Sequence, residues 1–160
     1  MRETIKVLCK YYVLFAVFGW IYYCIEILFR GYSHWSMFLL AGLCCVLIGM
    51  LNEFTDKETS IWLQMLWSAL LVTLFEFLFG VILNMGLKWH IWDYSDAPFN
   101  VMGQVCLPFT LIWYFLSLPA ILLDDLMREK FFGEEGHQYN WKLQNKSYKK
   151  QSHSGTVGNN

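Results

Sequence analysis

Two glutamates interrupt long apolar runs of this sequence, and their carboxylates are its most conspicuous candidates for chemistry. Glu26 lies in the run 11–29 and Glu76 in the run 61–83. A charged side chain at the centre of a bilayer costs about 2.5–3.5 kcal/mol on insertion scales, so each requires a polar partner or a function. Glu26 precedes Arg30 by four residues, the spacing of an ion pair on one helix face. For Glu26 two interpretations are open: this ion pair at the membrane interface, or a polar group that faces a cavity or ligand.

Glu76 is too deep in its run to reach the interface easily. At helical spacing it shares a face with Ala69, Thr73 and Gly80. Small residues let a second helix approach closely, and a polar group on that face can hydrogen-bond across the contact. We therefore expect Glu76 and Thr73 either to join two helices or to belong to a functional site.

An aromatic, polar loop at 88–100 is the third candidate region. Its aromatic rings suit the headgroup region of a membrane. Pro98 ends any preceding helix, and Asn100 is placed to cap the next one. An interfacial belt does not explain the polar residues among the rings, and Glu26 and Glu76 lie in the half of the membrane below this loop. A shared polar site is one hypothesis, with candidate residues from the loop at His90, Trp92, Asp93, Tyr94, Ser95 and Asn100.

The composition predicts that membrane helices position these residues. The chain of 160 residues is 56% hydrophobic and 16% charged, whereas soluble domains carry about 25% charged residues. Hydrocarbon about 30 Å thick needs roughly 20 apolar residues of helix. Four runs qualify, and they predict an all-α integral membrane protein whose four transmembrane helices form one domain over 1–132. The predicted spans are 11–29, 35–51, 61–83 and 101–123.

The basic residues predict the orientation of the spans. Apart from Arg30 and Lys88, every Lys and Arg lies at the N-terminus, in the loop after the second span or after the fourth span. Cytoplasmic segments carry the excess of basic residues, so we expect both chain ends inside and the aromatic loop outside. After Asp125, a short amphipathic extension over 126–132 is expected along the inner surface. The polar segment 133–160 is predicted to be a disordered cytoplasmic tail.

Small residues and prolines predict how the helices pack. Ala41, Cys45 and Gly49 form a small-residue face on the second span, either for packing within the chain or against a second copy. Pro108 and Pro119 in the fourth span predict a kink.

Several classes of function lack their motifs. The sequence contains no GxxxxGK[ST] phosphate loop, so an ATP-driven activity would need a partner chain. The five cysteines show no CxxC or Cys/His spacing, and we expect no metal and no cofactor. Neither a nucleophile elbow nor HExxH is present, so an enzyme built on Asp93, Glu76 and His90 is the least favoured class. Lipid is the expected surrounding, and nucleic acid is not an expected partner.

Two segments resemble a known family. Phe18-Gly19-Trp20, followed by Glu26, resembles the first span of the putative type IV ABC-transporter permease family of CmpB-like bacterial membrane proteins. The segment 92–113 is similar to that family's block W-D-Y-S-x-x-P-x-N-x-x-G-x-x-C-L-x-x-x-x-x-W. After the first span, Arg30-Gly31-Tyr32 is all that corresponds to the family's N-R-G-F-x-x-G-P-x-x-P-I-Y-G segment.

The resemblance implies a permease-like subunit of a bacterial ABC-type transporter that lacks its own ATPase. Its implied partners are a separate ATPase subunit and further copies of the same chain, in the bacterial inner membrane. The alternative from the residues is a small membrane scaffold or sensor that binds lipid or a partner protein through the aromatic loop.

Overall fold

The computed structural model describes residues 2–55, 59–134, 139 and 141. Four helices dominate it: α1 (Arg2–Arg30), α2 (Trp35–Phe54), α3 (Ile61–Gly80), which continues as the π-helix η1 (Val81–Gly86), and α4 (Leu107–Phe132). Each is long and apolar enough to cross a membrane, as the sequence predicts. Gly133, in the left-handed conformation, ends α4. The predicted disorder of the tail concerns residues that, for the most part, lie outside the described ranges.

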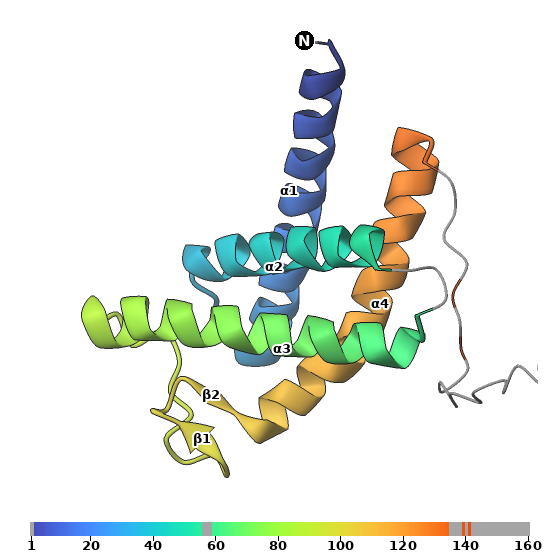
Figure 1. The fold of residues 1–160 in the computed structure, drawn as a ribbon. Helices are drawn as coiled ribbons and strands as arrows, with labels where there is room; N and C mark the ends of the chain where they lie inside the picture. The colour runs from blue at the N-terminus through green and yellow to red at the C-terminus, as the bar shows by residue number, and fades with distance from the viewer. Residues whose placement is uncertain (1, 56–58, 135–138, 140, 142–160) are drawn as a thin grey trace, which may run out of the picture.

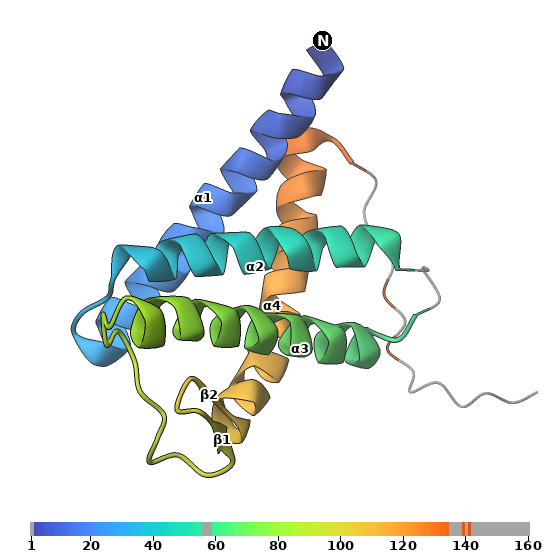
Figure 2. The same cartoon turned by 60° about the vertical axis from the view of Figure 1, so that its left-hand side comes forward.

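The helices form two crossed pairs. In Figures 1 and 2, α2 and α3 run side by side, while α1 and α4 cross them. Glycines allow α1 to sit close against α2: a Cβ on Gly19 would lie 2.7 Å from the backbone oxygen of Phe38, and one on Gly42 2.6 Å from that of Phe15. Gly49 faces α4 in the same way, next to the side chains of Asp124 and Arg128. In the described part of the chain, the small-residue face of α2 therefore packs against helices of the same chain.

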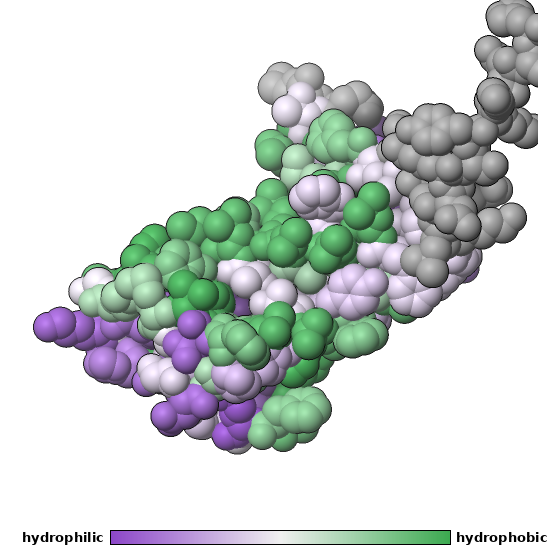
Figure 3. Space-filling model, turned by 60° about the horizontal axis from the view of Figure 1, so that its bottom comes forward, coloured by the Kyte–Doolittle hydropathy of each residue, from purple (hydrophilic) through white to green (hydrophobic). Residues whose placement is uncertain are grey.

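Successive helices alternate in direction, which gives the molecule two ends. The loop end contains the end of α1, the start of α2 and the segment 87–106; the terminal end contains the start of α1, the end of α2 and the end of α4. Figure 3 shows hydrophilic side chains gathered at the loop end and hydrophobic side chains along the helices above it. Which end faces the cytoplasm stays a prediction from the basic residues.

The fourth helix begins later than the sequence predicts. Residues 100–106 form a small hairpin instead of the start of a span: β1 (Asn100–Val101) pairs antiparallel with β2 (Val105–Cys106) around a turn at Met102 and Gly103, both with positive φ. The expected start at Val101 is therefore wrong. Once these residues pair as strands, α4 can begin only at Leu107.

The predicted helix cap at Asn100 is also wrong. Its Nδ2 donates to the backbone oxygens of Ser95 (3.0 Å) and Ala97 (2.9 Å), and its Oδ1 accepts from Gly103 N (3.2 Å). Asn100 thus closes turns in the loop and does not cap α4, whose N-cap position is Cys106.

The other helix ends extend beyond the apolar runs. Hydropathy marks only the apolar part of a helix, whereas backbone hydrogen bonds continue into polar sequence at both ends. Accordingly, α1 begins at Arg2, and α4 runs unbroken to Phe132 through the segment predicted as a separate extension. Pro108 sits in the first turn of α4, where proline is tolerated, while Pro119 lies inside the helix, and the axis of α4 bends part-way along in Figure 1.

Candidate functional site

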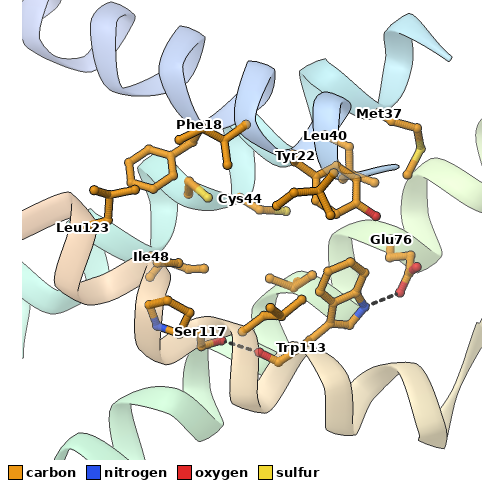
Figure 4. A pocket seen from close by; sticks show the side chains of 18 residues that line it. Phe18, Tyr22, Met37, Leu40, Cys44, Ile48, Glu76, Trp113, Ser117 and Leu123 are labelled. Carbon is orange, nitrogen blue, oxygen red and sulfur yellow. Dashed lines mark hydrogen bonds between the residues drawn. The ribbon is translucent and has the colours of Figure 1, made fainter. Parts of the chain in front are cut away.

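A cavity of about 190 Å³ lies between α1 and α4, with α2 and α3 completing its walls. Its lining is almost entirely aliphatic and aromatic. Figure 4 shows Phe18 and Leu123 at one end and Tyr22, Trp113 and Glu76 at the other. The cavity is therefore an apolar space within the helical bundle that carries one carboxylate in its wall.

Glu76 is held at the cavity wall by two neutral donors from different parts of the chain. Its side chain is 2% exposed. Tyr94 Oη donates to Oε1 at 3.0 Å, and Trp113 Nε1 donates to Oε2 at 2.9 Å. Each hydrogen bond to a charged group contributes about 1.5–3 kcal/mol. Glu76 therefore joins α3 to the loop and to α4 and also lies in the cavity wall. That it belongs to a functional site stays a hypothesis.

Tyr94 is a fixed donor to Glu76. Its ring stacks on Phe109 with a centroid distance of 4.6 Å, and its backbone N–H donates to Gly103 O at 2.8 Å. Burial, followed by the nearby charge of Glu76, raises the pKa of the Tyr94 hydroxyl. The phenol therefore stays protonated at neutral pH and keeps its proton available to the carboxylate.

Glu26 forms the predicted ion pair. Arg30 Nη1 lies 2.6 Å from its Oε1, and Ser33 Oγ donates to Oε2 at 2.5 Å. Arg30 also reaches across to the loop through Nη2, which donates to Ile91 O at 3.0 Å. Although Glu26 is 5% exposed, it is not part of the cavity wall; Tyr22, one helical turn earlier, takes that place.

Asn84 fixes the loop to η1, and the sequence analysis missed it. Its Nδ2 donates to Trp92 O (2.9 Å) and to Gln104 Oε1 (3.0 Å), while its Oδ1 accepts from Ile91 N (2.8 Å). The indole of Trp92 in turn donates to Gln104 O at 2.9 Å. The signal available in the sequence was a lone amide directly after a long apolar run. Asn84 thus anchors the segment 91–92, which directly precedes Tyr94.

The polar loop residues do not join this site. His90, Asp93 and Ser95 are exposed. Asp93 Oδ1 accepts from Ser95 N (2.9 Å) and Ser95 Oγ (2.6 Å), and these hydrogen bonds lower the pKa of the Asp93 carboxyl. Asp93 therefore caps a local turn. Of the predicted loop residues, Trp92 and Tyr94 face inward.

Thr73 joins two helices and lies outside the cavity wall. Its Oγ1 hydrogen-bonds Thr110 Oγ1 at 3.1 Å, which links α3 to α4. In the part of the chain that the structure describes, no three His, Cys, Asp or Glu side chains are arranged to hold a metal ion.

A network of charges closes the terminal end. Arg128, 3% exposed, pairs with Asp124 at 2.6 Å and with Glu53 of α2. Lys10 of α1 lies 3.3 Å from Glu53 and 2.6 Å from Glu134. The sequence signal for it was the four-residue spacing of Asp124 and Arg128, the same spacing as in the pair at the loop end. The network ties α1, α2 and α4 together at the opposite end from Glu76.

Comparison with known proteins identifies one family. Neither curated proteins nor solved structures give a significant match to the chain. The model of the family described as "Putative ABC-transporter type IV" matches residues 10–141, which include α1 from Lys10 onward, the other three helices, the hairpin and the residues that line the cavity. With four apolar helices, the chain is a multi-pass membrane protein, and it belongs to the family of type IV ABC-transporter-related membrane proteins.

Proposed function

We propose that the chain is the permease-like membrane subunit of an ABC-type transporter whose ATPase is a separate polypeptide. The observation that carries this proposal is the apolar cavity lined by residues of all four helices, with Glu76 in its wall. A pocket between helices of a bundle is a usual place for a small-molecule site. The sequence has no phosphate-binding loop of its own, so energy from ATP requires a partner.

The contacts at the two ends suggest how access to the cavity changes. At the loop end, Arg30 of α1 holds Ile91; at the terminal end, Arg128 of α4 holds Glu53 of α2. Opening the cavity toward either side requires one of these sets of contacts to separate while the other holds. Both are polar contacts near the ends of the helices, where water can replace the broken hydrogen bonds.

The terminal end is the proposed docking side for the ATPase. The positions of the basic residues favour placing this end on the cytoplasmic side of the membrane. The resemblance to a bacterial family favours the inner membrane of a bacterium. A partner that moves Glu53 disturbs both Lys10 and Arg128, and so acts on α1 and α4 together. The cavity is small, which favours assembly with a second copy to complete a pathway.

Co-purification tests the proposal. The tagged full chain is extracted from its native membrane in mild detergent and its companions are identified and quantified by mass spectrometry. An ATPase in stoichiometric amount is the expected result, with an unrelated four-span membrane protein carrying the same tag as the control. If the chain is recovered alone, or with partners that bind no ATP, the proposal of an ABC-type subunit is wrong.

A second candidate is a membrane scaffold or sensor that binds lipid. One observation favours it: the cavity wall is apolar apart from a few groups such as Glu76, Tyr22 and Ser117, as suits a lipid chain. Recovery of the chain with tightly bound lipid, without an ATPase, is the result that selects this alternative.

A further inference from the structure

The cavity is large enough for a compact apolar molecule. Its volume of about 190 Å³ exceeds that of a closed apolar cavity of roughly 150 Å³ that binds benzene. Tyr22 and Ile25 of α1 and Leu116 of α4 are among the side chains that line it. Its size and lining therefore favour a ring or a short branched hydrocarbon body.

Glu76 differs from the other buried carboxylates. Among the described residues, Glu26, Glu76 and Asp124 are the buried acidic side chains. Glu26 is paired with Arg30 and Asp124 with Arg128, each at 2.6 Å. Glu76 receives two hydrogen bonds from neutral groups, and no cation of the described chain forms an ion pair with it. A carboxylate oxygen accepts more than one hydrogen bond, so Glu76 retains acceptor capacity for a ligand.

Two aromatic rings, those of Tyr22 and Trp113, lie in the cavity wall near Glu76. The rings of Tyr22 and Trp113, both in the cavity wall, have centroids 5.7 Å apart. In Figure 4 both lie at the same end of the cavity as Glu76. The faces of tyrosine and tryptophan attract cations, most strongly where water is excluded. An apolar cavity that ends in two aromatic rings and an uncompensated carboxylate complements a lipophilic cation.

We infer that the substrate of this cavity is a small lipophilic cation, an amine or quaternary ammonium with a compact apolar body, whose charged head lies beside Glu76, Tyr22 and Trp113. This inference rests on the proposed function, for which it names the substrate class. A neutral lipid chain would fill the apolar part of the cavity and leave the carboxylate without a counter-charge.

A pair of probes that differ in charge alone tests the inference. Benzyltrimethylammonium and neopentylbenzene have the same shape, because a quaternary nitrogen in the first replaces a quaternary carbon in the second. Binding of each to the purified full chain is measured by equilibrium dialysis in neutral detergent micelles, after correction for partition into empty micelles. We expect the cation to bind the chain at least tenfold more tightly than its neutral counterpart.

Variants locate the binding site. Glu76→Gln keeps the shape and removes the charge, and we expect it to lose about tenfold or more in affinity for the cation while neopentylbenzene binds as before. Glu129→Gln removes one carboxylate from an exposed position on α4 and should leave both affinities unchanged. Ala120→Phe fills the cavity and should abolish binding of both probes. This third variant keeps the test decisive if Glu76→Gln proves unstable.

Equal affinity for the two probes, or no binding of either, would overturn the inference. So would a charge preference that survives in Glu76→Gln or in Ala120→Phe, since the cation would then bind elsewhere. The assay uses the chain without any ATPase. If the cation does not bind but an ATPase co-purifies, the inferred substrate class is wrong and the proposed function stands. If the cation binds at Glu76 but no ATPase co-purifies, the cavity binds lipophilic cations and the proposal of an ABC-type subunit is wrong.

Discussion

Replacing Asn84 with leucine should release the loop from η1. The substitution keeps a side chain of similar size and removes all three hydrogen bonds, to Trp92 O, Gln104 Oε1 and Ile91 N. Asn84 is 6% exposed, so the two backbone groups lose their partners where water does not readily replace them. A buried group left unpaired costs about 1–3 kcal/mol, hence roughly 2–6 kcal/mol for the two.

Hydrogen exchange measures this loss directly. Amide exchange followed by mass spectrometry, on the full chain in lipid nanodiscs, reports the opening of the peptide that contains Ile91. A loss of about 2 kcal/mol or more in local stability predicts exchange roughly thirtyfold faster or more in Asn84→Leu. Asp96→Asn, at an exposed position of the same loop, is the matched control and should exchange like the wild type. Exchange at Ile91 that changes less than threefold in Asn84→Leu would refute this account of the loop.

Two further predictions concern helix packing and are read from thermal denaturation in detergent. Gly42→Val places a Cβ 2.6 Å from the backbone oxygen of Phe15 and should cost about 1–3 kcal/mol, whereas Gly86→Ala, whose nearest neighbour lies at 3.5 Å, should be nearly neutral. Arg128→Met leaves Asp124 buried without its cation and should cost about 3–5 kcal/mol, most of which Arg128→Met combined with Asp124→Leu should restore.

Each packing prediction has a contrary outcome. If Gly42→Val melts like the wild type, α1 and α2 are not in the close contact described. If the double variant at positions 124 and 128 is less stable than Arg128→Met alone, the unpaired charge of Asp124 is not the cause of the lost stability.

The helices could be predicted from sequence because their signal is local. Runs of apolar residues long enough to cross hydrocarbon identify all four. The pairing of Glu26 with Arg30 was equally accessible, since both residues lie on one helix and helical spacing alone brings them together. The ends of the helices were less accessible, because polar residues extend α1 and α4 without changing the apolar pattern.

The partners of Glu76 could not be predicted, because they come from elements distant in sequence. Trp113 lies 37 positions away and Tyr94 lies 18 away, and nothing local relates them to the carboxylate. Placing Tyr94 requires the hairpin 100–106, whose strands have two residues each and whose turn depends on Gly103 at positive φ. Strands this short leave no alternating pattern to detect.

The terminal charge network shows the same limit. The predicted fourth span ends at 123, directly before Asp124 and Asp125. In the structure Asp124 lies inside α4, 1% exposed, with Arg128 one turn later and Gly49 of α2 against the pair. The absence of a side chain at Gly49 makes room for this buried pair, and that requirement becomes visible only once the two helices are placed together.

The most direct test of the central claim is ATP hydrolysis by the partner ATPase, reconstituted in lipid vesicles with and without this chain. As a membrane subunit that couples hydrolysis to its own helices, the chain should raise the hydrolysis rate, and Ala120→Phe, which fills the cavity, should reduce that effect. A rate that is the same with the chain, without it and with the variant would contradict the account.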